Sequence, residues 1–336
     1  MRKSSTRSST APHPNPPPRR PRQLPETPGT PRLIVAGRGN LGRSLAAGLR
    51  AAGHEVRLVS ARKGLPALVR SIAPTGSAVI FLTVPDDAVA AVAVRLAALG
   101  DGIPTNVAFV HASGALELGV LAPLRPRHSV GSFHPLRSFP EPGTPEAFRG
   151  IVIGVDASSE SLRRVLNRLA RDLGAKPKRV DDAQRAVYHA AAVFASNYVV
   201  ALLAEAVRLL EHSGWTEKEA VQGLVPLAEG AVANVRKRGP IPALTGPIRR
   251  GDAETVRRHL AALAALDAQA GRAGGTRRAK GASRMGPIDR KTDLYRMLGD
   301  VVLEIAQQAG LKRAAAEQTR RALTRKVAAT RRRPRK

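Results

Sequence analysis

The chain has 336 residues, with 55 Lys and Arg against 26 Asp and Glu, no Cys, and a formal net charge of +29. A hydrophobic share of 43% can fill a buried core and excludes a wholly disordered chain. The lack of Cys excludes disulfides, thiolate zinc sites, iron–sulfur clusters and cysteine nucleophiles. Most of the positive charge lies in residues 1–31, 270–292 and 312–336. Nucleic acid is therefore expected as a partner of the basic tails, if at all, and not of the main body.

Residues 1–31 contain nine Pro and almost no large apolar side chains, which is typical of a disordered basic tail. This tail lacks the apolar core of a secretory signal. The most apolar long run, residues 190–204, has 15 residues and is short for a membrane span, which needs about 20. We therefore expect a cytoplasmic protein with no membrane partner, in which residues 190–204 belong to a buried helix.

Beyond the tail, short apolar strands alternate with helices. Strands are predicted at residues 32–37, 55–60, 78–83, 107–111 and 150–155, with a short one at 178–180 and another that precedes residues 132–137. Helices are predicted at residues 41–52, 86–98 and 158–173. This alternation indicates an α/β fold, a Rossmann-type doubly wound and mostly parallel sheet, over residues 32–181.

From residue 182 the pattern is helical only. Helices are predicted at residues 183–212, 216–237, 252–268, 294–309 and 312–328, the second opened by a capping box of Thr216 and Glu219. Residues 182–330 are thus predicted to form an all-helical C-terminal domain. Within it, the Gly-, Arg- and Lys-rich residues 270–292 are predicted to be a flexible basic insertion, and residues 331–336 a basic tail.

A glycine-rich segment follows the first predicted strand and opens the first helix. It reads Gly37-Arg38-Gly39-Asn40-Leu41-Gly42, and its position is that of a dinucleotide-binding loop. The first glycine permits a tight turn, the second a close approach to pyrophosphate, and the third close packing of helix and strand. The helix N-terminus adds free N–H donors. We predict that Gly37, Gly39, Asn40, Leu41 and Gly42 bind the cofactor.

Two other interpretations of this segment are less favoured. Residues 37–44 also fit a P-loop except at Arg43, where a P-loop has Lys, and Arg does not replace that Lys freely. A glycine-rich turn that binds nothing is the remaining alternative.

The end of the second strand usually selects between NAD and NADP, and an acidic residue there binds the ribose of NAD. This chain has no acid there but has Ser60, Arg62 and Lys63. The sequence therefore favours NADP (NADPH) over NAD, although these residues also fit a surface loop in a chain rich in Arg and Lys.

Polar or turn-forming residues follow three more strands, where ligands of doubly wound sheets bind. We predict cofactor contacts from Thr83, Val84, Pro85, Ser113 and Gly114. His134, stiffened by the Pro that follows it, is a candidate for polarising a carbonyl or holding a carboxylate. For each of these residues, a capping, turn or stacking role is the alternative.

The helical region contributes a second polar set. Tyr188, His189, Ser196 and Asn197 interrupt an apolar helix, which is costly unless they line a cleft or form a satisfied network. Thr245, Arg249 and Arg250 lie in a Gly- and Pro-punctuated loop, where an Arg could bind a substrate carboxylate or be solvated. No HExxH, GxSxG or calcium-loop motif is present, so nothing supports metal or serine-hydrolase chemistry.

Together these segments resemble a group of candidate oxidoreductases in which a Rossmann-like domain precedes a domain of unknown function 2520. The resemblance spans about residues 32–311 and is carried by the segments Gly37–Gly42, Thr83–Asp86, His111–Gly114, Gly131–Leu136, Tyr188-His189 with Asn197, Leu244–Asp252 and Tyr295–Gly299. The group is similar in architecture to pyrroline-5-carboxylate reductases, 6-phosphogluconate dehydrogenases and prephenate dehydrogenases. The resemblance implies that the helical domain forms the substrate side of the cleft and a homodimer interface.

Our first hypothesis is an NADP-dependent reductase or dehydrogenase. It would transfer hydride between nicotinamide and a small anionic carbonyl, imine or hydroxy-acid substrate in the interdomain cleft. His189 or His134 would donate the proton, Asn197 and Ser113 would orient the substrate, and Thr245, Tyr188, Arg249 and Arg250 would bind it. The alternative is an NADP-binding sensor or scaffold without catalysis.

Overall fold

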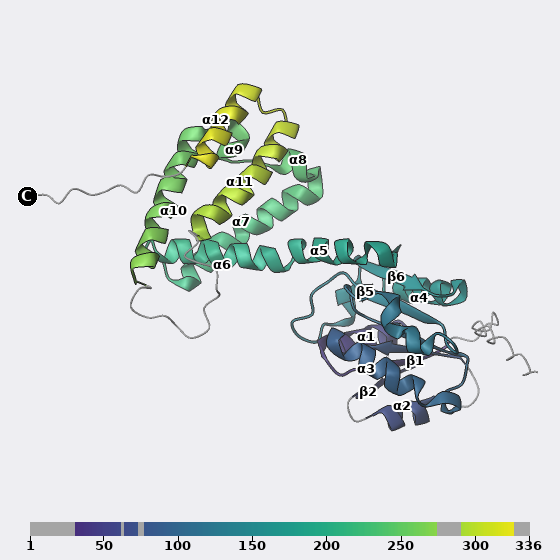
Figure 1. Ribbon diagram of the computed structural model, residues 1–336. Helices are drawn as coiled ribbons and strands as arrows, with labels where there is room; N and C mark the ends of the chain where they lie inside the picture. The colour runs from purple at the N-terminus through teal and green to yellow at the C-terminus, as the bar shows by residue number, and fades with distance from the viewer. Residues whose placement is uncertain (1–30, 62–63, 73–76, 274–289, 326–336) are drawn as a thin grey trace, which may run out of the picture. The chain divides into compact units, whose positions relative to one another are not determined.

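The computed structural model describes residues 31–61, 64–72, 77–273 and 290–325 (Figure 1). The chain divides into two compact units, Met1–Leu202 (unit 1) and Leu203–Lys336 (unit 2). The predicted tails at residues 1–31 and 331–336, and most of the predicted insertion at residues 270–292, lie outside the described residues.

Unit 1 is built on a sheet that has seven strands in the described residues, in the order β2-β1-β3-β4-β5-β6-β7. Their bounds are β1 Arg32–Ala36, β2 Val56–Val59, β3 Ala78–Leu82, β4 Val107–His111, β5 Val130–Pro135, β6 Val152–Ala157 and β7 Lys176–Arg179. All neighbouring strands are parallel except β5 and β6, which are antiparallel. The predicted Rossmann-type, mostly parallel sheet is confirmed.

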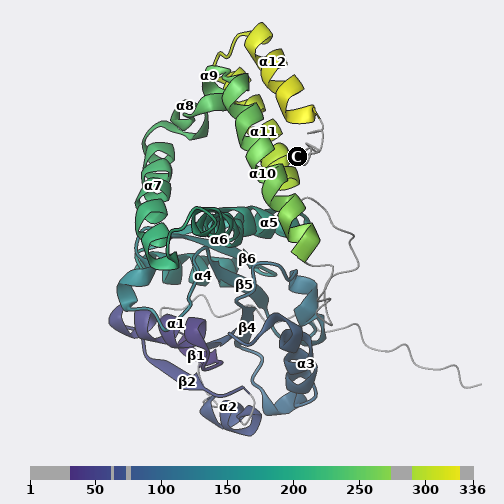
Figure 2. The same ribbon diagram turned by 90° about the vertical axis from the view of Figure 1, so that its left-hand side faces the viewer.

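Helices cover both faces of this sheet (Figure 2). They are α1 Asn40–Ala51, α2 Leu65–Ser71, α3 Asp86–Ala97 and α4 Glu160–Asp172, with 3-10 turns η1 Gly100–Gly102, η2 Leu118–Leu124, η3 Pro145–Phe148 and η4 Asp182–Gln184. Successive side chains of a strand point to opposite faces. Leu33 and Val35 therefore pack with α1 and α4, whereas Ile34 packs with α2 and α3.

Strand β1 lies between β2 and β3. The chain therefore adds β2 on one side of β1 and then β3 on the other side. The carboxyl ends of β1 and β3 form the switch point at which doubly wound sheets bind ligands. The glycine-rich loop follows β1, and Thr83 follows β3, so both lie at this position.

The predicted helix over residues 183–212 is two helices, α5 Arg185–Ala195 and α6 Asn197–Glu211. Ser196 separates them, and its ψ of −75° with φ of −125° is not helical. Helix α5 packs on the sheet through Arg185 and Tyr188, so it belongs to unit 1. The two units accordingly divide after Leu202, about a helix later than the boundary expected at residue 182.

The expectation that residues 190–204 form a buried helix is wrong within the described chain. Phe194 is 66% exposed and Val200 67% exposed, and α6 contains no buried residue. The stretch Asp182–Glu211 is long and apolar enough to cross a membrane by length and composition, and none of its most apolar window is buried. Hydropathy identifies an apolar helix but not what covers it.

Unit 2 is helical. Its further helices are α7 Glu217–Arg238, α8 Pro240–Ala243, α9 Pro247–Arg250, α10 Ala253–Ala273, α11 Arg290–Gln308 and α12 Arg313–Thr324. Helices α9 to α12 share a core that includes Ile248, Val256, Leu260, Leu303 and Leu323. The predicted capping box is present at the start of α7, where Thr216 and Glu219 satisfy each other's backbone N–H groups.

Candidate functional site

The three glycines of the loop after β1 have different surroundings. A Cβ on Gly37, whose φ is +145°, would lie 2.5 Å from the Thr83 carbonyl oxygen, and a Cβ on Gly42 would collide with the Gly37 carbonyl oxygen. A Cβ on Gly39 would meet nothing within 4 Å. Gly37 and Gly42 are therefore required by packing, whereas Gly39 leaves open space beside the first turn of α1. That open space fits the close approach of a dinucleotide pyrophosphate.

Thr83 holds this loop through hydrogen bonds. Its hydroxyl donates to the Gly37 carbonyl oxygen at 3.2 Å, and its N–H donates to the Ala36 carbonyl oxygen at 3.0 Å. Val84 packs against the core on the α3 side, and Pro85 precedes α3 as its N-cap. These predicted cofactor residues thus hold the loop, fill the core and start α3.

Asn40 stands in the first turn of α1, as predicted, but its side chain points to another segment. Its Nδ2 donates to the carbonyl oxygens of Phe139 at 3.1 Å and Pro140 at 2.7 Å. A contact between Asn40 and a cofactor would therefore come from its backbone. Leu41 lies in the same helical turn.

Ser60 follows β2 at the same edge of the sheet. Arg62 and Lys63, predicted with it to select NADP, lie outside the described residues.

A cluster of aromatic and imidazole rings lies at the end of β5. His134 Nδ1 and the Tyr188 hydroxyl are 2.9 Å apart, and the rings of His134 and His189 have centroids 6.3 Å apart. Gly114, at the end of β4, faces both imidazoles, because a Cβ there would lie 2.8 Å from His134 Nε2 and 2.8 Å from His189 Nδ1. The fold thus brings together four of the predicted site residues.

Burial keeps His134 and Tyr188 of this cluster neutral at neutral pH. Burial lowers the pKa of His134 to about 4, with further lowering from His189 and Arg185 and opposition from Asp86. Burial raises the pKa of the Tyr188 hydroxyl. In the hydrogen bond between the neutral imidazole and the protonated phenol, one group donates and the other accepts, so a proton is held between His134 Nδ1 and the Tyr188 hydroxyl.

This ring cluster opens into a cavity of about 460 Å³ within unit 1. The cavity is lined by residues of α5, the end of β5 and the segment after it, among them His134, Tyr188, His189, Ser196, Asn197, Leu136, Arg137 and Ser138. Sequence reasoning missed Arg137. It could have been found as the cation that closes the polar segment after β5.

Ser113 is engaged in local structure. Its hydroxyl donates to Asp86 Oδ2 at 2.7 Å and accepts the N–H groups of Ala115 and Leu116, both at 3.1 Å. All the hydrogen-bonding capacity of this hydroxyl is thereby used. The structure thus favours the turn alternative for the Ser113 side chain over substrate orientation.

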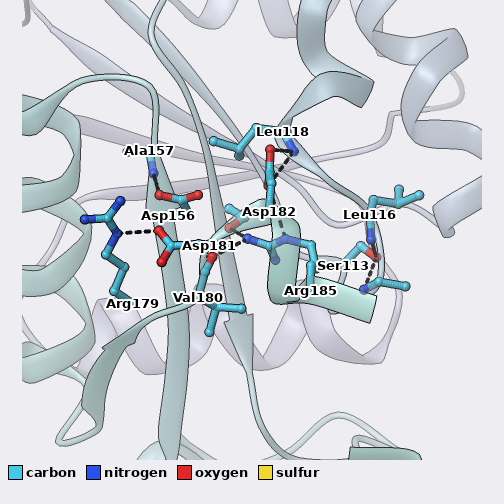
Figure 3. Close-up of polar contacts among 12 residues, drawn as sticks. Ser113, Leu116, Leu118, Asp156, Ala157, Arg179, Val180, Asp181, Asp182 and Arg185 are labelled. Atoms are coloured by element: carbon cyan, nitrogen blue, oxygen red, sulfur yellow. Dashed lines mark hydrogen bonds and ion pairs between the residues drawn. The ribbon is translucent and has the colours of Figure 1, made fainter. Parts of the chain in front are cut away.

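Figure 3 shows a buried arginine, Arg185, with its polar partners. Arg185 is fully buried, and its Nη2 donates to Ser132 Oγ at 2.7 Å and to the Val180 carbonyl oxygen at 3.1 Å. Its Nε lies 3.5 Å from Asp182, whose carboxylate accepts the Leu118 N–H. This group joins η2, β5 and the start of α5. Sequence reasoning missed Arg185, because an Arg in the first turn of a helix looks solvated.

Thr245, Arg249 and Arg250 line a second cavity, of about 650 Å³, which lies wholly in unit 2. Lys312 also lines it, and Arg249 Nη2 donates to the Ala309 carbonyl oxygen at 2.8 Å. The cavity is therefore cationic and suited to an anion.

Comparison with known proteins bears on the fold and the family. Residues 151–274 match the family model of a domain of unknown function (DUF2520). No curated protein matches the chain. A candidate NADP oxidoreductase from Bacteroides fragilis, BF3122, is 23% identical with a TM-score of 0.59. Protein TM1727 from Thermotoga maritima is 24% identical with a TM-score of 0.58.

Each of these two alignments covers 82% of this chain and 98% of the other. At such identity the two structures establish a shared fold. The family match begins just before β6 and ends just after α10, so it includes the last part of the sheet and helices α4 to α10. The resemblance drawn from the sequence motifs is thereby confirmed: residues 151–274 match the DUF2520 model, and the chain shares its fold with these two structures.

Proposed function

We propose that the protein is an oxidoreductase that uses a nicotinamide dinucleotide, with NADP preferred over NAD. The observation that carries this proposal is the open space at Gly39, between two glycines that packing requires, at the switch point of the sheet. The description of the Bacteroides fragilis relative as a candidate NADP oxidoreductase supports it. When bound, such a cofactor supplies or accepts hydride.

The residues that would hold the dinucleotide lie along the carboxyl edge of the sheet. The backbone of residues 39–42 would bind the pyrophosphate at the start of α1. Ser60, with Arg62 and Lys63, would bind a 2′-phosphate, and the absence of an acid there is what favours NADP. Thr83 would act by holding Gly37 in place, since its hydroxyl is already bonded to that residue.

The substrate would bind in the cavity beside His134, Tyr188 and His189. A carbonyl, imine or hydroxy-acid substrate exchanges one proton for each hydride. The His134–Tyr188 pair would hold that proton at His134 Nδ1 or at the phenolic oxygen. Arg137 is the cation of this cavity and would bind an anionic group, while Asn197 would orient the substrate. Arg249, Arg250 and Thr245 remain a second candidate anion site, in unit 2.

A homodimer is also part of the proposal. Of the 22 residues of α7, Ala220 is the one with a buried side chain in the described structure, while Leu227 is 71% exposed. On α11, Met297 is 70% exposed and Val301 54% exposed. Exposed apolar side chains in this number on two helices of unit 2 mark an interaction surface. A second copy is the partner that we propose to cover it.

Gly39→Ala tests the cofactor site directly. Its φ of −67° suits Ala and the added Cβ has room, so the thermal unfolding midpoint should not change. NADPH binding, followed by nucleotide fluorescence, should weaken about tenfold or more, because the methyl group occupies the space for pyrophosphate. The matched control is Ala47→Ser, further along α1, which should leave NADPH binding unchanged.

Equal NADPH affinity in wild type and Gly39→Ala would refute the proposed site. Equal affinity for NADH and NADPH would refute the preference. NADPH binding without hydride transfer to any member of a carbonyl and imine panel would favour the sensor alternative.

A further inference from the structure

The segment between β5 and η3, residues 136–143, is tied down at both ends; we name it the strap. At its far end, Asn40 Nδ2 donates to the carbonyl oxygens of Phe139 and Pro140, and the Gly143 N–H donates to Ser44 Oγ at 2.7 Å. At its near end, the hydroxyls of Ser138 and Ser196 lie 3.0 Å apart. The strap therefore connects the first turns of α1 with the break between α5 and α6.

The attachment to α1 is the more rigid of the two. Ser44 is fully buried, and its hydroxyl also donates to the Asn40 carbonyl oxygen at 2.7 Å. Asn40 and Ser44 thus form one hydrogen-bonded group with the strap. The Phe139 ring packs against Phe148, with ring centroids 5.4 Å apart. Pro140 and Pro142 further limit the backbone conformations of this half.

The near half of the strap forms part of the cavity wall. Leu136, Arg137 and Ser138 all line the 460 Å³ cavity, and Arg137 is its cation. Leu136 is 39% exposed, so packing restrains the near half of the strap only weakly. The hydrogen bonds to α1 restrain the far half more strongly. The backbone of the near half is also held by the sheet, because the Leu136 N–H donates to the Val152 carbonyl oxygen at 2.9 Å and the Arg137 N–H to the Pro135 carbonyl oxygen at 2.8 Å. Arg137 therefore lies between this attachment to the sheet and the attachment of the far half to α1.

Asn40 directly follows Gly39, the residue with open space for pyrophosphate. We propose that the strap couples the dinucleotide loop to the substrate cavity and that Asn40 is the positioning residue of this coupling. The proposal rests on the proposed function. Ordering of residues 39–42 by a dinucleotide restrains the Asn40 amide, which restrains Phe139 and Pro140 and through them Arg137. By linkage, a ligand held by Arg137 strengthens dinucleotide binding by the same factor.

The chemistry of Asn suits this role. Its amide nitrogen has two hydrogens, which serve two successive carbonyl oxygens. Asp at this position would place acceptor against acceptor, and Ala would remove both bonds. Gln keeps the donor group and is the conservative replacement.

Hydrogen exchange of the full chain with and without saturating NADPH tests the coupling. In the wild type, NADPH should slow exchange of the strap amides at least about fivefold, the lower end of ordinary coupling between sites. In Asn40→Ala, NADPH should still bind but the slowing should be lost. Asn40→Gln should restore part of it. The matched control is Arg43→Ala in the same helix, whose Nε bonds the Arg38 carbonyl oxygen and not the strap.

The possible outcomes test the coupling and the proposed function separately. Strap slowing that persists in Asn40→Ala, or that is absent from a wild type that binds NADPH, would overturn the coupling and leave the proposed function standing. A wild type that does not bind NADPH would overturn both. An unchanged thermal midpoint in Asn40→Ala, together with loss of the NADPH response, separates positioning from a merely structural role.

Discussion

His111 should make the sheet of unit 1 sensitive to acid. It is the last residue of β4, is fully buried, and pairs in register with Leu82 and Ser132 of the neighbouring strands. Burial, with Arg185 adding to it, lowers the pKa of His111 from 6.5 to about 4, while Asp182 opposes the shift. The folded protein therefore holds this imidazole neutral at pH values where the unfolded chain would protonate it.

The sign follows from proton binding. Between pH 6.5 and 4 the unfolded chain binds the proton and the folded chain does not, so stability falls as pH falls through this range. The whole shift is worth about 3 kcal/mol, at about 1.4 kcal/mol per pKa unit. About 2 kcal/mol of it should be lost between pH 7 and pH 4.5.

The perturbation is His111→Leu, which removes the titration and keeps an apolar side chain at a buried position. Native-state hydrogen exchange of β4 amides in urea, at pH 7 and pH 4.5, measures the unfolding free energy of unit 1 alone. The wild type should lose about 2 kcal/mol more than the variant over this interval. His128 and His134 are present in both proteins, so their contributions cancel.

A control is His212→Asn, at an exposed position at the end of α6, which should leave the acid response of β4 unchanged. Equal acid losses in wild type and His111→Leu would refute the argument, because the neutral imidazole would then contribute nothing to the pH dependence.

Three further predictions concern packing, capping and assembly. Gly114→Ala should destabilise unit 1 by about 1–3 kcal/mol in urea, because the new methyl group must displace two imidazole rings, and an unchanged midpoint would contradict that packing. Thr216→Ala should speed exchange of the first α7 amides and cost about 1 kcal/mol by loss of the capping box, whereas Ser213→Ala should not. Leu227→Asp combined with Met297→Asp should halve the mass measured by light scattering if a second copy covers these side chains, and a wild-type monomer would refute the homodimer.

The strand and helix positions of the sheet could be predicted because burial on both faces leaves a plain sequence pattern. β1, β3 and β4 are short apolar runs bounded by turn residues. The antiparallel orientation of β5 and β6 was harder to predict, since strand direction depends on the path of the connection. The connection over residues 136–151 holds one 3-10 turn and no α-helix, whereas the crossover between parallel neighbours is usually an α-helix.

The candidate site was predictable in its location and less so in its contacts. His134, Tyr188 and His189 come together because α5 packs on the sheet at the end of β5. The hydrogen bonds of Ser113 and Thr83 were not predictable as such, because short hydroxyl side chains can serve either a ligand or their own turn. Arg185 left no sequence signal at all, because burial of a cation depends on distant partners such as Ser132.

For the exposed apolar stretch Asp182–Glu211, hydropathy and backbone geometry together distinguish between a lipid bilayer and a protein as the partner. By composition it suits a bilayer as well as a protein surface. However, the helix is broken at Ser196, near the middle, and a break within hydrocarbon would leave backbone groups without partners. The exposed apolar side chains also continue onto α7, which carries Glu229 and Arg236 in its second half. Apolar residues interleaved with charges fit a protein interface with a polar rim better than lipid, and this is the surface that the proposed homodimer would use.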